Sequence, residues 1–93
     1  MKAELIERSR VVVSDTAFYE VVLWYLPAPV PGSNHRFKYR LALIVNDTCV
    51  LRYDNERGKG DHRHMLGREE PIEFTSLSAL YDAFRADMER ILG

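Results

Sequence analysis

The 93-residue sequence contains one cysteine and no long apolar run, and both scarcities narrow the possible protein classes. Cys49 cannot form an internal disulfide, and its place in an expected strand predicts a buried structural thiol in a reducing compartment. The longest apolar run, 21–26, is too short to span a membrane. An early acid, Glu4, and the lack of an apolar centre argue against an N-terminal signal peptide. We therefore expect a cytoplasmic protein with no membrane partner.

Net charge is also nearly absent, at −1 for the whole chain, yet the charges are unevenly distributed. Residues 35–68 carry eight cations and four carboxylates, and they contain all three histidines. Residues 69–93 carry two cations and six carboxylates. Charge blocks are usually ordinary solvated faces. Here the histidines within the basic block favour a surface that binds phosphate groups, beside an acidic helix that faces away.

The chain is long enough for one domain, residues 1–93, with a modest core. Runs rich in β-branched and aromatic residues predict strands at 5–13, 17–26, 36–45 and 48–53, and a short strand at 72–74. A proline-rich stretch, 27–34, predicts a stiff loop. Apolar residues at helical spacing predict a helix that begins at Ser76 and buries Leu80, Tyr81, Phe84 and Met88. The expected fold is α+β: an antiparallel β-meander of four to five strands with a C-terminal α-helix packed on one face.

The third and fourth expected strands are joined by residues 46–47, an Asn-Asp pair that tolerates positive φ and favours a two-residue hairpin turn. With that turn, Arg40 lies opposite Tyr53, and Lys38 lies opposite Asn55. The basic side chains of one strand would then adjoin the polar residues of the next.

The most informative stretch is 52–64, which we call the polar segment. It holds four cations, three carboxylates, two histidines and two glycines. Ordering such residues costs conformational entropy and buries little apolar surface. We therefore expect the polar segment to contain a functional site. We expect 57–67 to form a glycine-containing loop, with a short extended piece at 62–64.

Two histidines of the polar segment are the candidates for proton transfer, because imidazole acts as base and acid near neutral pH. Two residues apart on an extended chain, they point to the same side. RNA cleavage needs a base for the 2′-hydroxyl, an acid for the leaving 5′-oxygen and cations on the phosphorane. We assign catalytic roles to His62, His64, Asp54 and Arg52, and substrate-binding roles to Asn55, Arg57, Lys59, Arg63, Lys38, Arg40 and Tyr53. The alternative is that both histidines are exposed loop residues without a task.

A metal site is the competing interpretation, because His-x-His can place two imidazoles on one ion together with Asp54 or Asp61. The surrounding cations would repel a divalent ion, so we expect no metal and no cofactor. The glycines around Lys59 resemble a phosphate-binding loop, but no Ser or Thr follows the lysine. Most aromatic residues, Trp24 among them, are expected in the sheet core. His35, at the end of the proline-rich loop, is expected to face solvent.

Three pieces of the sequence carry a family resemblance: PVPGSNHRFKYR at 29–40, VLRYDN at 50–55 and HRH at 62–64. Together with the helix, they make residues 23–88 resemble the TumE-like toxin family of bacterial toxin–antitoxin systems. The resemblance implies a small toxin-like domain that is neutralised by a cognate DNA-binding antitoxin from the same operon. Many members continue the Asp-Asn pair with Pro-His-His, whereas this chain has Glu-Arg-Gly-Lys at 56–59.

The sequence thus supports two functional hypotheses. The first is the toxin of a type II module that cleaves RNA as a small metal-independent endoribonuclease. The second is a non-catalytic module whose basic face binds RNA, the ribosome or an acidic partner through charge. In either case an exposed strand edge would allow the antitoxin to add a strand, or two copies to pair as a homodimer.

Overall fold

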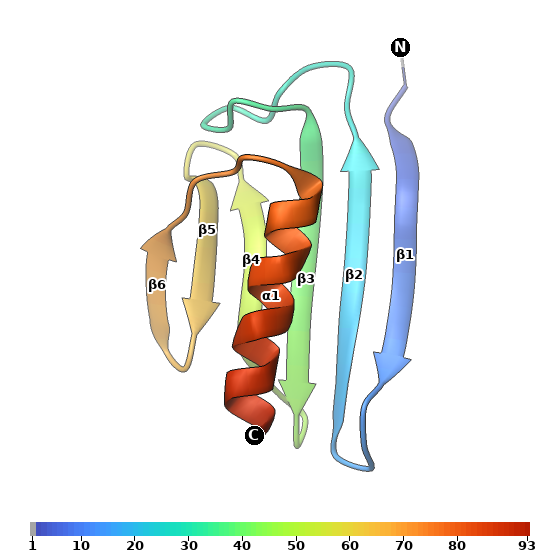
Figure 1. Cartoon of the computed structure of the whole chain (residues 1–93). Coiled ribbons are helices and arrows are strands. Elements are labelled where there is room, and N and C mark those ends of the chain that lie inside the picture. The colour runs from blue at the N-terminus through green and yellow to red at the C-terminus, as the bar shows by residue number, and fades with distance from the viewer. Residues whose placement is uncertain (1) are drawn as a thin grey trace.

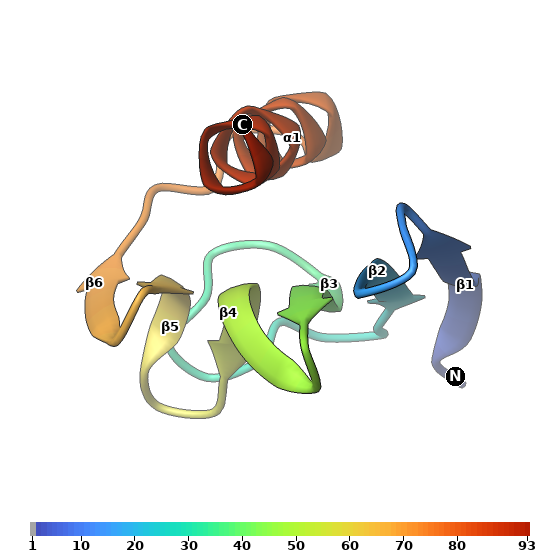
Figure 2. The ribbon, with the colours of Figure 1, turned by 90° about the horizontal axis from the view of Figure 1, so that it is seen from below.

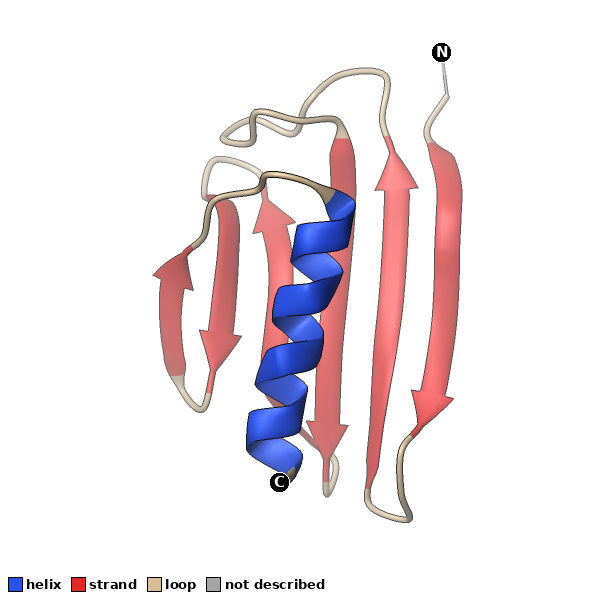
Figure 3. Cartoon of the chain, viewed as in Figure 1, coloured by secondary structure: helices blue, strands red, loops and turns tan. Residues whose placement is uncertain are grey.

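A computed structural model describes residues 2–93 as a six-stranded sheet followed by a helix (Figures 1 and 3). All neighbouring strands are antiparallel and their order in the sheet is their order in the chain. The elements are β1 (Glu4–Val12), β2 (Ala17–Tyr25), β3 (Phe37–Val45), β4 (Thr48–Glu56), β5 (Gly60–Met65), β6 (Arg68–Pro71) and α1 (Leu77–Leu92). The predicted α+β meander is confirmed, with more strands than the four to five expected.

One additional strand, β5, lies within the region predicted as a loop, 57–67, and β6 follows directly after that region. The extended piece expected at 62–64 is confirmed as part of β5, whereas the prediction of a loop for the rest of β5 is wrong. The glycines of this region turn the chain at two points instead of keeping it irregular. Gly58 has a φ of 82° and its N–H donates to the carbonyl of Pro31 at 2.6 Å. Gly60 approaches the proline-rich loop so closely that a Cβ there would lie 2.7 Å from the carbonyl oxygen of Gly32. The strand predicted at 72–74 is also wrong, because these residues form the connection from β6 to α1.

The turn at 46–47 is confirmed, since both residues have positive φ and Val45 pairs with Thr48. The predicted register beyond it is wrong by one residue. A bulge leaves Val50 as an extra residue of β4, and Arg40 therefore lies opposite Asp54 instead of Tyr53. A shift of one residue exchanges the two faces of a strand. The bulge thus brings Asp54 to the basic side of the sheet and sends Tyr53 into the core.

The core lies on one face of the sheet, beneath α1, while the other face has no helix over it (Figure 2). Ser76 caps α1 by accepting a hydrogen bond from the N–H of Ala79 at 3.0 Å. Three of the four apolar helix residues predicted to be buried, Leu80, Phe84 and Met88, are buried, and the fourth, Tyr81, is only partly buried against the core. The sheet side of this core consists of Val21, Leu23, Tyr39, Leu41, Leu43, Leu51 and Tyr53. We call the uncovered side the open face.

Two single-residue expectations fail for a local reason. Cys49 is exposed, because it is the second residue of β4 after the β3–β4 turn and directly precedes the bulge. Trp24 pairs with Lys38 and lies outside the core, on the open face. No helix in the described residues is long and apolar enough to cross a membrane.

A buried carboxylate fastens α1 to the sheet. Asp87 is 2% exposed and accepts hydrogen bonds from the Tyr53 hydroxyl and, at 3.0 Å, from Nη1 of Arg63. Arg90 donates to its other oxygen at 2.8 Å. Burial, and then the hydrogen bond to Asp87, raise the pKa of Tyr53 to about 12.

This hydrogen bond predicts a loss of stability in alkali. The pKa of Tyr53 is raised above its ordinary value of 10.0 in the folded state, so the folded protein holds this proton more tightly than the unfolded chain. The free energy of unfolding should therefore fall between about pH 10 and 12, by at most about 1.4 kcal/mol per pH unit from this group. Urea unfolding across that range should show a shallower fall for Tyr53→Phe. A fall of unchanged slope in that variant would contradict the assignment.

Candidate functional site on the open face

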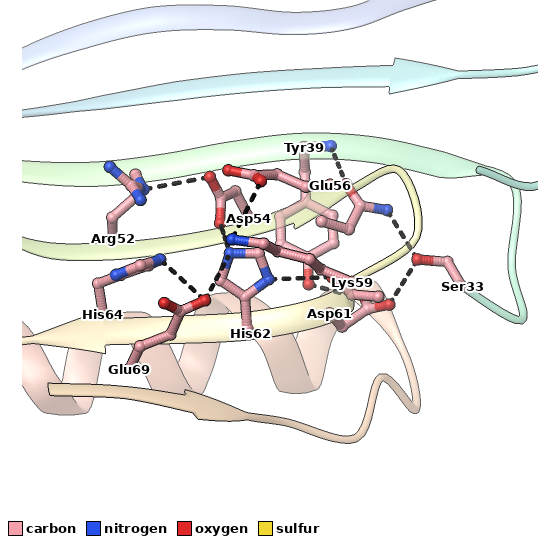
Figure 4. Close-up of polar contacts among 12 residues, drawn as sticks. Ser33, Tyr39, Arg52, Asp54, Glu56, Lys59, Asp61, His62, His64 and Glu69 are labelled. Atoms are coloured by element: carbon pink, nitrogen blue, oxygen red, sulfur yellow. Dashed lines mark hydrogen bonds and ion pairs between the residues drawn. The ribbon is translucent and has the colours of Figure 1, made fainter. Parts of the chain in front are cut away.

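The open face brings together five polar side chains from three consecutive strands. Asp54 of β4 pairs with His62 of β5, Arg52 pairs with His64, and His64 in turn pairs with Glu69 of β6. Because directly paired residues point to the same side of a sheet, all five lie away from α1. Figure 4 shows their side chains converging. We call these residues the open-face cluster.

His62 is the most constrained member, with its side chain only 4% exposed. Its Nδ1 lies 3.0 Å from the carbonyl oxygen of Gly60. A carbonyl only accepts, so Nδ1 carries the proton and donates. The other ring nitrogen, Nε2, lies 2.8 Å from Oδ1 of Asp54 without making a hydrogen bond. In neutral His62 this nitrogen carries a lone pair that faces the Asp54 carboxylate. Two acceptor atoms at this distance require a proton or another cation between them.

The remaining members surround this pair. Nε of Arg52 lies 3.1 Å from the second carboxylate oxygen of Asp54. Oε1 of Glu69 lies 3.7 Å from Nε2 of His62 and 3.6 Å from Nε2 of His64. The two imidazole rings are 5.0 Å apart at 71°. Sequence reasoning missed Glu69, because nothing in the chain around it indicated that β6 would pair with β5.

Access to the two histidines differs. The side chain of His64 is 30% exposed on the open face, although its Nε2 atom is shielded from solvent. His62 is reached through a hollow of about 340 Å³, whose other lining residues are Lys59, Glu69, Glu70 and Pro71. An exposed imidazole beside a buried one that is held by a carboxylate can transfer protons, and the same lone pairs can bind a metal ion.

Three residues predicted to bind substrate lie on the helix side. Tyr53 donates to Asp87, and Arg63 contacts Asp87 and Glu70. Asn55 is 0% exposed. Its side chain accepts from the N–H of Tyr39 at 3.0 Å and donates to the carbonyl of Phe37 at 2.7 Å, which joins the ends of β3 and β4. The geometry gives these residues structural contacts and keeps them away from the open-face cluster.

The other predicted binding residues lie nearer the cluster. Arg57 and Lys59 are exposed in the β4–β5 turn, where Lys59 lies 3.8 Å from Glu56. Nζ of Lys38 donates to the backbone carbonyl of Asn55. Arg40 lies 3.7 Å from Glu20 and is exposed on β3.

A basic surface continues from the cluster across the open face. The strand pairing puts Arg8, Arg10, Lys38, Arg40 and Arg52 on this side, together with the aromatic residues Phe18 and Trp24. The guanidinium of Arg10 lies 3.9 Å from the centre of the Phe18 ring. Cations interleaved with partly exposed aromatic side chains are typical of surfaces that bind single-stranded nucleic acid.

A second polar cluster, on the helix side, explains His35, whose predicted exposure to solvent is wrong. Its side chain is 9% exposed, with Nε2 2.7 Å from Oδ2 of Asp61 and its ring stacked on Phe74 at 3.8 Å. Asp61 also accepts from the hydroxyls of Tyr39 at 2.8 Å and Ser33 at 2.7 Å. Burial, and then Asp61, raise the pKa of Tyr39 far above its ordinary range. This cluster ties the proline-rich loop to the sheet.

Comparison with known proteins agrees with the resemblance found in the sequence. A family model described as Toxin TumE matches residues 2–92. Neither the comparison with curated proteins nor that with solved structures found a match. The family model covers nearly the whole chain, including every element that supplies the open-face cluster. The chain belongs to the TumE toxin family.

Proposed function

We propose that this protein is the toxin of a type II toxin–antitoxin module and acts on RNA as a small metal-independent endoribonuclease. The observation that carries the proposal is the convergence of His62 and His64 with Asp54 and Arg52 on an uncovered sheet face. Such groups contribute nothing to the core. Two histidines, a carboxylate and a guanidinium are the groups that phosphodiester cleavage requires.

The exposure of the histidines suggests separate roles. His64, the more exposed of the two side chains, would take the proton from the 2′-hydroxyl. His62, reached through the hollow beside Lys59, would return a proton to the leaving 5′-oxygen. Asp54 lies 2.8 Å from Nε2 of His62 and would stabilise its imidazolium form. Arg52 would orient Asp54 and offset the charge that builds on the phosphorane.

The basic part of the open face would position the RNA. Its cations would contact phosphates, and Phe18 and Trp24 would stack on unpaired bases. Arg57 and Lys59 extend this surface at the β4–β5 turn. We leave Tyr53, Asn55 and Arg63 out of the proposed RNA-binding surface, because their side chains contact protein groups on the helix side.

Purified protein that has been stripped of metal should cleave a labelled single-stranded RNA. The expected products are a 2′,3′-cyclic phosphate and a 5′-hydroxyl, because the nucleophile is the neighbouring 2′-oxygen. Cleavage should be unchanged by a chelator and absent when the nucleotide at the cut site carries a 2′-deoxyribose. Intact RNA after prolonged incubation with folded wild-type protein, with and without divalent ions, would refute the ribonuclease proposal.

A non-catalytic binding module is the second candidate, and one observation favours it. The side chain of His62 is nearly inaccessible to solvent. The basic side chains, in contrast, extend across the open face from β1 through β3 to β4. Such a surface would hold RNA, the ribosome or an acidic partner through charge, and its affinity would fall steeply with salt.

Membership of a toxin family implies an antitoxin partner. We propose that the antitoxin is a DNA-binding protein from the same operon and that it silences the toxin by covering the open face. The two free sheet edges are β1 and β6. The longer one, β1, has exposed apolar residues at Leu5, Ile6, Val11 and Val12. Strand addition by the antitoxin at β1, or pairing of two copies there as a homodimer, would cover them.

A further inference from the structure

We propose that the open-face cluster binds one divalent transition metal ion of the zinc class. Asp54, His62 and His64 would supply three ligands and Glu69 the fourth. This differs from the expectation drawn from the sequence, which assigned no metal to these residues. The proposal does not depend on the ribonuclease activity, because it concerns binding alone.

The positions of the candidate ligand atoms fit a single ion. One ligand atom from each of Asp54, His62 and His64 lies within 4.8 Å of the others. Oε1 of Glu69 is 3.7 Å and 3.6 Å from the two imidazole nitrogens. Zinc bonds of about 2.0–2.1 Å in a tetrahedron put ligand atoms roughly 3.3–3.4 Å apart. The observed separations, together with 2.8 Å between His62 and Asp54, bracket that value.

The lone pairs of these atoms have no other use in the described residues. Nε2 of His62, Nε2 of His64 and Oδ1 of Asp54 are all shielded from solvent and make no hydrogen bond. His62 carries most of this argument, because its side chain is 4% exposed and its Nδ1–H already donates a hydrogen bond to the Gly60 carbonyl. With both imidazoles neutral and unprotonated at Nε2, three acceptors converge without a donor between them, which is unfavourable in a buried site, and one cation would satisfy all of them.

Contacts behind the ligands resemble those that orient metal-binding side chains. The Nδ1–H of His62 donates to the Gly60 carbonyl, which fixes the tautomer that leaves Nε2 free for a metal. Nε of Arg52 lies against the Asp54 oxygen that does not face the histidines. A ligating carboxylate is often held in this way through its second oxygen.

Apart from Arg52, the cations that the sequence placed around the site do not contact the candidate ligands, although Lys59 lines the hollow beside His62. Arg63 is on the helix side with Asp87. Lys59 lies beside Glu56, and Arg57 is exposed in the turn. The adjacent cation is Arg52, whereas the cluster itself contains two carboxylates. The local charge therefore favours a divalent ion.

An ion in this site would take the lone pairs that His62 and His64 need for proton transfer. If the proposed ribonuclease function holds, the metal-loaded toxin would be inactive, and zinc would act as a reversible inhibitor. Zinc-dependent cleavage would instead refute the metal-independent mechanism while supporting the metal site.

The test is equilibrium dialysis of metal-free protein against Zn²⁺, without RNA. We expect one ion per chain. His64→Ala should weaken binding by more than about 100-fold, and Glu69→Gln by about tenfold. Glu70→Gln is the matched control, because Glu70 neighbours Glu69 on β6 but contacts Arg63 on the other side. The Glu70→Gln variant should bind Zn²⁺ with the affinity of wild type. Replacement by Co²⁺ should give visible absorption from imidazole and carboxylate coordination.

A second measurement protects the test against misfolding. Zn²⁺ at tenfold excess over its Kd should raise the Tm of wild type by about 5 °C or more and leave that of folded His64→Ala unchanged. The proposal is overturned by the absence of stoichiometric binding to wild type, or by binding that His64→Ala and Glu69→Gln do not weaken.

Discussion

Replacing His62 and His64 together with alanine should abolish growth arrest when the protein is expressed under tight control. General acid–base catalysis contributes about 10²–10⁴-fold to a rate, and both proposed proton carriers are lost in this variant. RNA cleavage by the purified double variant should fall by at least about 100-fold. The measurements are the number of surviving cells after induction and the rate of cleavage of a labelled RNA.

Charge variants on the same face separate catalysis from binding. Lys38→Glu with Arg40→Glu should weaken RNA binding in a salt-dependent way and leave both histidines in place. If the histidine variant arrests growth as strongly as wild type, while this charge variant does not, the protein is a binding module. Circular dichroism and thermal unfolding must show that each variant is folded at the growth temperature.

Phe84→Ala should lower the free energy of unfolding by about 3–5 kcal/mol, because it leaves a cavity between α1 and the sheet. Phe84 is 3% exposed. Its ring makes edge contacts with Tyr19 at 6.0 Å and Tyr53 at 5.8 Å between ring centres. Aromatic pairs of this geometry add to the energy of burial. Urea unfolding measures the change through the midpoint and the slope.

Arg85→Ala provides the matched control for this prediction. Arg85 is the next residue of α1, its side chain is 65% exposed, and its substitution should change the free energy by no more than about 0.5 kcal/mol. A midpoint for Phe84→Ala that equals those of wild type and Arg85→Ala would mean that the helix does not pack on the sheet as described.

Local sequence patterns predicted most of the fold because each strand pairs with the next one along the chain. Alternation and β-branched residues marked β1 to β4, and apolar spacing marked the buried face of α1. The bulge at Val50 was not predictable, since it depends on how Leu51 and Val50 both pack against the core. Its effect was large, because it decides whether Asp54 or Tyr53 shares a face with Arg40.

The candidate site was predictable in part for the same reason. The His-x-His spacing correctly indicates two imidazoles on one side of a strand, and the residues paired with them on the adjacent strands are then their neighbours. Composition could not indicate that Arg63, between them, would turn toward Asp87, a residue 24 positions away. Nor could it indicate Glu69, whose position depends on a short edge strand. Contacts between distant residues remain outside what local patterns encode.

The order of the elements has a consequence for how the protein is made. Each of the five strand pairings joins neighbours in the chain, so the sheet can assemble strand by strand as it is synthesised. Its apolar face, however, remains exposed to solvent until α1, the last element, has been synthesised and packs over Leu41, Leu43 and Leu51. A ribosome that stalls before α1 therefore releases a sheet without a covered core. We expect such fragments to be degraded. Folded toxin would then accumulate only when translation has continued through the codons of α1.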